Sequence, residues 1–177
     1  MNSYAPFLAE LLRFYLGFIL LAAAWGKSRT YTYFLSQLTE SFLIPPVASR
    51  VIAPCILLLE WALALGILLL NSRWAIIVAA VLFTLFSLVL LQRYVSDGAV
   101  KCSCFGETDR PVTDYDLLRN GWLIAVFLAC LWLNDTAFGI TIPLQLFSAG
   151  LAVLLTLITI NFSDIMLQLV DTTEAGR

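Results

Sequence analysis

The chain has 177 residues, of which 61% are hydrophobic and only 12% are charged, and its formal net charge is −2. A soluble domain carries about 25% charged residues, so a chain this apolar could not cover a soluble surface, and we expect an integral membrane protein. The small, unclustered charge argues against nucleic-acid binding. The absence of histidine excludes His-ligated haem, His-containing zinc and copper sites, and any catalytic pair with a histidine base.

Five apolar segments come close to the ~20 residues that a helix needs to cross the hydrocarbon core of a bilayer. They cover residues 6–26, 51–70, 74–91, 115–133 and 142–160. The sequence contains no internal repeat and no sign of a second domain. We therefore predict that residues 1–177 form one all-α domain, a compact bundle of four to five transmembrane helices, followed by a polar tail that frays.

The connector between the first two spans predicts a short additional helix. One face of this helix would be apolar, with Tyr31, Phe34, Leu35, Leu38 and Phe42. The other face would be polar, with Thr32, Ser36, Gln37 and Glu40. Such a helix lies either in the headgroup interface or as a strap on the bundle. We expect Pro45 and Pro46 to end it and Pro54 to occupy the first turn of the second span.

The longest strongly polar interval, residues 92–116, contains the run Lys101-Cys102-Ser103-Cys104-Phe105-Gly106. A Cys-x-Cys pair can close a small, strained disulfide ring, and strain makes a disulfide easy to reduce. Lys101 beside the pair would favour the thiolate, which is the attacking species. The main prediction is a redox-active dithiol, while a structural disulfide, two idle thiols and a two-thiolate Cu(I) site remain alternatives. Zinc would need two further ligands, so no metal site is assigned.

Glu60 falls near the middle of the second span. A charged residue at such a depth costs about 2.5–3.5 kcal/mol and usually faces the bundle interior. It could carry protons or contact a ligand, or it could make a packing hydrogen bond to Thr84, Ser87 or Asn120. Cys55 and Cys130, which also lie inside apolar runs, are predicted to be small apolar filler.

Lys27 and Arg119 lie at the ends of two spans, on the same side as the cysteine motif. Their default interpretation is snorkelling to the headgroups. They could instead form an electropositive mouth that stabilises a thiolate.

The distribution of basic residues bears on the side of the membrane that the cysteine motif faces. Five spans would place the first connector, the cysteine motif and the C-terminus on one side. Eight of the ten Lys and Arg residues fall on that side. The positive-inside rule therefore predicts that the motif faces the cytoplasm.

Several landmarks run in order from about residue 14 to 133. They are Ala24-Trp25-Gly26-Lys27, Leu43-Ile44-Pro45-Pro46, Pro54 with Glu60 and Gly66, Cys102-Ser103-Cys104-Phe105-Gly106, and Leu118-Arg119-Asn120. In these landmarks the chain resembles the MauE branch of the MauE/DoxX-like membrane proteins, a group of redox-associated integral membrane proteins. Cys-x-Cys-Phe-Gly followed by Leu-Arg-Asn is the specific part. Ser103 stands where that family usually has Gly, which would change the geometry of a disulfide ring.

The resemblance implies a multi-pass protein of the bacterial cytoplasmic (inner) membrane. It implies a role in maturing a disulfide-rich periplasmic redox-enzyme subunit, of the methylamine dehydrogenase type, together with a thioredoxin-like periplasmic partner. It also favours a periplasmic cysteine motif, against the count of basic residues.

The function predicted from the sequence is membrane thiol–disulfide exchange, possibly as an oxidoreductase. Cys102 and Cys104 would exchange, Lys101 and Arg119 would favour the thiolate, and Glu60 would couple protons. An analogy with other membrane oxidases of disulfides makes a quinone a candidate electron acceptor. The alternatives are a non-enzymatic membrane chaperone or assembly scaffold, and a small transporter with Glu60 in its pathway.

Overall fold

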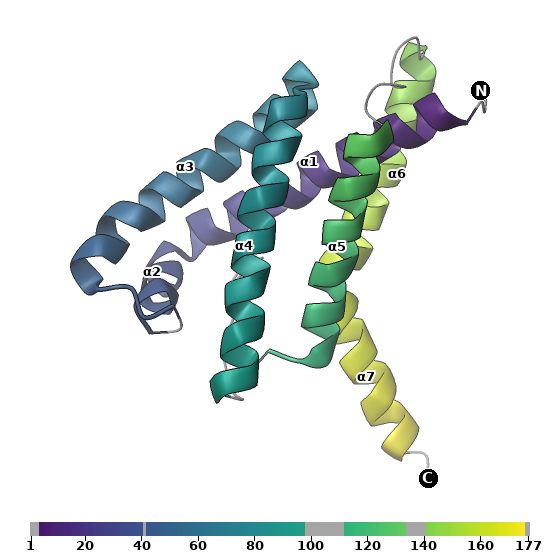
Figure 1. Cartoon of the computed structure of the whole chain (residues 1–177). Helices are drawn as coiled ribbons and strands as arrows, with labels where there is room; N and C mark the ends of the chain where they lie inside the picture. The colour runs from purple at the N-terminus through teal and green to yellow at the C-terminus, as the bar shows by residue number, and fades with distance from the viewer. Residues whose placement is uncertain (1–3, 41, 98–111, 134–140, 176–177) are drawn as a thin grey trace.

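The computed structural model describes residues 4–40, 42–97, 112–133 and 141–175, and in these ranges its regular structure is entirely helical (Figure 1). The helices are α1 (Ala5–Arg29), α2 (Tyr31–Glu40), α3 (Pro46–Leu70), α4 (Arg73–Asp97), α5 (Asp114–Leu133), α6 (Ile142–Ile160) and α7 (Phe162–Ala175). Among the described residues, five helices are long and apolar enough to cross a membrane, namely α1, α3, α4, α5 and α6. The predicted all-α, multi-pass fold is confirmed.

The first helix, α1, occupies the centre of the bundle. It packs mainly against α3 and α6 and also contacts α5 (Figure 1). Leu16 and Ile19 of α1 are fully buried in a core that includes Ile67 of α3 and Phe127 of α5. At Gly17 a Cβ atom would lie 2.5 Å from Cδ2 of Leu68. A residue without a side chain therefore allows α1 and α3 to approach closely.

A tight turn joins α3 to α4, as the Asn71-Ser72-Arg73 sequence indicates. Asn71 adopts the left-handed conformation with φ of 46°, and its backbone N–H donates to the Gly66 carbonyl. Such a residue ends a helix by supplying donors to carbonyls that have no intrahelical partner. α3 and α4 consequently form an antiparallel hairpin.

The predicted start of the second span was wrong. α3 begins at Pro46 rather than Val51, because proline is well suited to the first helical position, where its fixed φ is helical and its missing N–H is not needed. Pro54 therefore lies inside α3 and not in its first turn. α2 already ends at Glu40.

Two further boundaries differ from the prediction. α4 continues beyond Leu91 to Asp97, and the polar tail forms α7 instead of fraying. The side chain of Ser163 in α7 donates to Oδ1 of Asp116 in α5 at 2.7 Å. This buried contact stabilises the start of α7 against the bundle.

The short helix α2 is a strap packed on the bundle. Phe34 and Leu38 are buried against Ala53 of α3. Gln37, which was predicted on the polar face, is only 6% exposed. The buried face of α2 is therefore wider than the apolar stripe read from the sequence.

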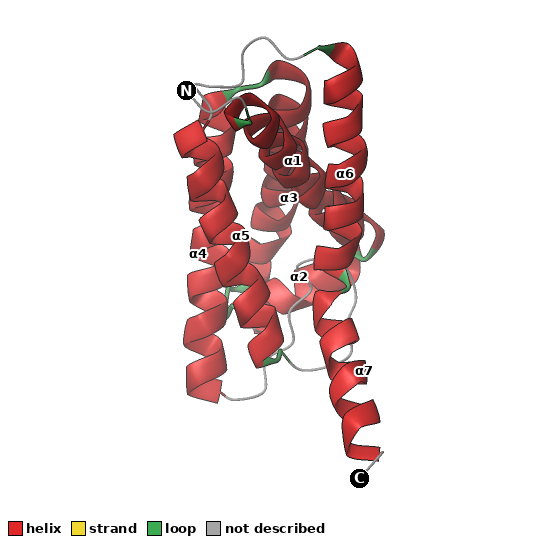
Figure 2. Cartoon of the chain, turned by 90° about the vertical axis from the view of Figure 1, so that its right-hand side faces the viewer, coloured by secondary structure: helices red, strands yellow, loops and turns green. Residues whose placement is uncertain are grey.

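Figures 1 and 2 show how the helix ends are distributed. α2, the last turn of α4, the first turn of α5 and the end of α7 lie at one end of the bundle, and the N-terminus and the α3–α4 turn lie at the other (Figures 1 and 2). We call the first of these the cysteine-loop end, because the chain between α4 and α5 contains the Cys-x-Cys motif. Lys101, Cys102 and Cys104 themselves lie outside the described residues.

Candidate functional site

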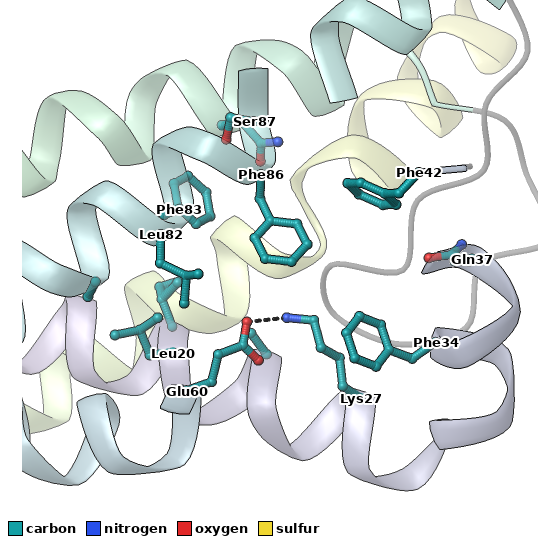
Figure 3. A pocket seen from close by; sticks show the side chains of 14 residues that line it. Leu20, Lys27, Phe34, Gln37, Phe42, Glu60, Leu82, Phe83, Phe86 and Ser87 are labelled. Carbon is teal, nitrogen blue, oxygen red and sulfur yellow. Dashed lines mark hydrogen bonds and ion pairs between the residues drawn. The ribbon is translucent and has the colours of Figure 1, made fainter. Parts of the chain in front are cut away.

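A buried ion pair joins α1 to α3. Lys27 Nζ donates to Oε1 of Glu60 (Figure 3), and the two residues are 6% and 5% exposed. The snorkelling predicted for Lys27 was wrong, because Glu60 offers its ammonium a charged partner inside the bundle. Lys27 was also not among the neighbours predicted for Glu60. Each charge offsets the cost of burying the other.

Aromatic rings surround the Lys27 ammonium. Its Nζ lies 5.7 Å from the ring centroid of Phe34 and 5.8 Å from that of Phe86 (Figure 3). Cation–π attraction at these distances stabilises a desolvated ammonium by about 2 kcal/mol. Phe42 packs edge-on against Phe86 at a centroid distance of 5.6 Å. The Lys27 ammonium therefore lies between a phenyl ring of α2 and a phenyl ring of α4.

The ion pair lines a small cavity of about 40 Å³, which we call the chamber. The chamber is bounded by residues from α1, α2, α3, α4 and α5 and by Phe42. Its polar lining residues are Lys27, Gln37, Glu60, Ser87 and Asn120. Most of the remaining wall is aliphatic or phenyl, so these polar groups lie in largely apolar surroundings.

Three side-chain oxygen atoms of the residues that line the chamber have no hydrogen-bond partner among the described residues. They are Oε2 of Glu60, Oγ of Ser87 and Oδ1 of Asn120. Ser87 and Asn120 were predicted as partners of Glu60, and they line the same cavity without a hydrogen bond to it. Buried oxygens without a donor are rare in folded proteins. The chamber is therefore a polar site with unused bonding capacity.

The chamber lies below the helix ends that flank the cysteine motif. Ser87 precedes the end of α4 at Asp97 by ten residues, and Asn120 follows the start of α5 at Asp114 by six. A helix rises about 1.5 Å per residue, so these side chains begin about 15 Å and about 9 Å from the respective helix ends. The chamber is thus within the half of the bundle that is nearer the cysteine-loop end.

Arg119 belongs to a separate polar cluster. It is 9% exposed, with Nη2 at 3.5 Å from Oδ1 of Asp116 and Nη1 at 3.4 Å from the Ile160 carbonyl. Asp116 also accepts from the backbone N–H and the hydroxyl of Thr113, both at 3.0 Å. Asp116 therefore caps the start of α5 through Thr113. The snorkelling predicted for Arg119 was wrong, and the structure does not bring Arg119 into the chamber with Glu60.

Arg119 instead lines a larger groove of about 460 Å³ between α1, α5 and α6. Within it the Tyr15 hydroxyl lies 2.6 Å from Oγ1 of Thr159, and Trp122 forms part of the wall. An apolar cavity of about 150 Å³ holds a ring the size of benzene. By volume, a quinone ring therefore fits the groove and does not fit the chamber.

Neither of the two cysteines in the described spans reaches the chamber. Cys55 is exposed on α3, so it is not the interior filler that was predicted. Cys130 is buried in the core, as predicted. Neither cysteine therefore adds a thiol to the lining of the chamber.

The sequence analysis did not identify the partner of Glu60 or the aromatic rings around Lys27. A usable signal was present, because ionisable residues inside membrane spans commonly pair with one another. Lys27 and Glu60 occur in two successive long apolar segments, at positions that an antiparallel arrangement can bring together. The contributions of Phe34 and Gln37 depend on how α2 folds back, which no local pattern specifies.

Comparison with known proteins relates this geometry to one family. The model of the family "Methylamine utilisation protein MauE" matches residues 5–133, a range that contains the ion pair, Asn120 and the Cys-x-Cys motif. The methylamine utilization protein MauE of Paracoccus denitrificans is 29% identical over 127 residues, covering 70% of this chain and 68% of that protein. No solved structure matches the chain.

Proposed function

The chain belongs to the MauE family, and from this premise we propose that it serves methylamine utilisation as a membrane component of thiol–disulfide exchange. The proposed task is the maturation of a disulfide-rich periplasmic redox-enzyme subunit of the methylamine dehydrogenase type. The partner would be a thioredoxin-like periplasmic protein. The proposed location is the inner membrane of a bacterium, with the cysteine motif on the periplasmic side, where disulfides persist.

Cys102 and Cys104 are the proposed exchanging pair. The thiolate of one attacks the disulfide of the partner, and the mixed disulfide that results is resolved by the other. One disulfide forms between Cys102 and Cys104 while the partner disulfide becomes a dithiol, so two electrons pass to the partner. The direction depends on the two reduction potentials.

The observation that carries the proposal is the buried Lys27–Glu60 pair beneath the cysteine-loop end. Both helices that flank the cysteine motif, α4 and α5, contribute to the wall of its chamber. Forming a thiolate releases a proton, and Glu60 has one carboxylate oxygen that no described donor occupies. Glu60 is therefore a candidate proton acceptor for the exchange.

Lys101 and Arg119 are proposed to favour the thiolate in different ways. Lys101 is adjacent to Cys102 in the sequence, so its charge acts directly. Arg119 holds the first turns of α5 through Asp116, so it would act as a positioning residue for the segment that precedes α5. A quinone as the final electron acceptor would have to bind in the groove of about 460 Å³, because the chamber of about 40 Å³ is too small for it.

The test is thiol trapping in intact cells with a membrane-impermeant maleimide, on a variant that retains only Cys102 and Cys104. Labelling only after mild reduction is the expected result, since it means an external and oxidised pair. Labelling without prior reduction would indicate free external thiols, as an idle docking loop or a reduced carrier would show, and would contradict an oxidised resting pair. Labelling only in permeabilised cells would overturn the periplasmic placement.

Two other functions predict different outcomes for the same protein. An assembly scaffold should still support enzyme maturation when Cys102 and Cys104 are both replaced by Ser, and an exchange component should not. The buried ion pair is also what a small transporter would use in its pathway. Loss of function in Glu60→Gln, with the two thiols still cycling between oxidised and reduced forms, would favour transport.

A further inference from the structure

The chamber combines three features that point to a bound ligand. Its volume is about 40 Å³. Glu60 and Asn120, which are 5% and 3% exposed, line it and each carry a buried oxygen without a hydrogen-bond partner among the described residues, and Ser87 adds a third such oxygen. These oxygens come from α3, α5 and α4, so the site is built from three separate helices. A ligand with several hydrogen-bond donors would satisfy all of them.

Size and charge select the ligand. A quinone or other ring does not fit, because the chamber is much smaller than the cavity of about 150 Å³ that holds benzene. A small organic cation would add net positive charge, because the charges of Lys27 and Glu60 already offset each other, and an uncompensated buried charge is costly. An apolar chain would leave the three oxygens without donors. Water meets every condition, since a buried water needs about 10–15 Å³ and two to four polar partners.

We infer that the chamber binds a cluster of about two or three water molecules and that this cluster carries protons between Glu60 and the cysteine-loop end. The hydration stands on the geometry alone, whereas the proton transfer rests on the proposed thiol–disulfide exchange. When a thiol ionises, its S–H bond breaks, the proton passes along the waters, and an O–H bond forms on Oε2 of Glu60. Lys27 keeps its charge and holds the other carboxylate oxygen, and the thiolate gains the negative charge that Glu60 loses, so the transfer leaves the net charge of the protein unchanged.

Asn120 and Ser87 would act as positioning residues for the water. Asn120 is the lining residue closest to the start of α5, and Ser87 extends the cluster towards α4. Neither side chain changes protonation near neutral pH, so their role would be to hold and orient water. Removing either should slow proton transfer without removing the proton acceptor.

Water-edited solid-state NMR of the whole protein in liposomes tests the hydration directly. The probe is polarisation transfer from water to the ¹³C-labelled carboxylate of Glu60, which the Glu60→Gln variant assigns. Glu10 is the internal control, because it is equally buried and its Oε2 is engaged by Arg13. We expect the build-up at Glu60 to be several-fold faster than at Glu10. Equal rates would overturn the inference.

Substitutions in the chamber supply the second arm. Ser87→Val and Asn120→Leu should displace water, reduce the transfer to Glu60 several-fold, and slow exchange between Cys102–Cys104 and a disulfide probe. Thr84→Val is the matched control, because Thr84 lies on α4 but not in the chamber wall. If Asn120→Leu fails to fold, Asn120→Ala and Ser87→Val carry the test. Unchanged water transfer in correctly folded Ser87→Val would contradict the assignment.

The two readouts separate this inference from the proposed function. A fast build-up at Glu60 in a protein whose thiols never exchange would retain the hydrated chamber and reject thiol–disulfide exchange. Thiol exchange that is as fast in Ser87→Val as in the wild type, despite loss of the water signal, would reject the proton route alone.

Discussion

Nη1 of Arg13 in α1 donates a hydrogen bond of 2.8 Å to the carbonyl oxygen of Ile67 in α3. The same nitrogen lies 3.0 Å from the Leu68 carbonyl, and Nε of Arg13 donates to Glu10 at 2.8 Å. The carbonyls in the last turn of a helix have no intrahelical donor, so Arg13 acts as a cap supplied by another helix. Together with the Lys27–Glu60 pair, this contact holds α1 to α3 at two well-separated points.

We expect Arg13→Leu to lower the free energy of unfolding by about 3–5 kcal/mol, because it leaves the Glu10 carboxylate buried without its cation. The measurement is the unfolding midpoint of the purified protein in detergent. The double variant Glu10→Gln with Arg13→Leu should recover part of the loss. A single variant as stable as the wild type would show that Arg13 does not contribute to the α1–α3 contact.

Lys27→Met should also destabilise the protein, by about 3–5 kcal/mol, because it leaves Glu60 without a counter-charge. The double variant Lys27→Met with Glu60→Leu replaces the pair by apolar groups, and it should regain stability but not maturation of the target enzyme. Thermal unfolding and a maturation assay in cells measure the two properties. A double variant that is stable and fully functional would mean that the pair serves only packing.

Gly17→Ala is predicted to destabilise the α1–α3 contact by about 1–3 kcal/mol, because an added methyl group overpacks a closely packed interface. Leu68 would have to move, since its Cγ lies 2.6 Å from the position of the new carbon. Gly121→Ala is the control, because a Cβ there meets no atom within 4 Å, and it should be neutral or stabilising. Equal effects of the two substitutions would contradict the close approach of the helices.

Ser163→Ala removes the hydroxyl that donates to Asp116. We expect a loss of about 1 kcal/mol, the usual contribution of one hydrogen bond, together with faster amide hydrogen exchange in α7. Thr172→Ala is a suitable control, because its hydroxyl bonds only within α7 to the carbonyls of Gln168 and Leu169. Hydrogen exchange in α7 that stays as slow as in the wild type would mean that other contacts hold this helix.

The sequence was sufficient to predict the transmembrane helices, but it was insufficient to predict the structure of the segment that connects α1 to α3. Runs of apolar residues near the length of a bilayer crossing identify transmembrane helices, because the backbone must satisfy its hydrogen bonds internally in lipid. The end of α3 at Leu70 and the α3–α4 turn were therefore predictable. The start of α3 was not, since Pro46 can either end one helix or begin the next.

The partner of Glu60 shows the second limit. The sequence placed a carboxylate in the second span and named three polar neighbours, but the choice depends on how helices are rotated and tilted against one another. A charged partner stabilises a buried carboxylate more than a hydroxyl or an amide does, and for this reason Lys27 is the observed partner. The roles of Cys102, Cys104 and Lys101 remain predictions, because these residues lie outside the described ranges.

The central position of α1 has a consequence for biosynthesis. α1 leaves the ribosome before α3 and α6, the two helices that cover its buried faces. Glu10, Arg13 and Lys27 thus enter the bilayer before the partners of Arg13 and Lys27 in α3 have been synthesised. Lys27 later pairs with Glu60, and Arg13 later donates to the carbonyls of Ile67 and Leu68. Until then the nascent segment carries ionisable groups that lipid does not solvate. α1 is consequently the segment of this protein with the greatest need for help from the membrane-insertion machinery.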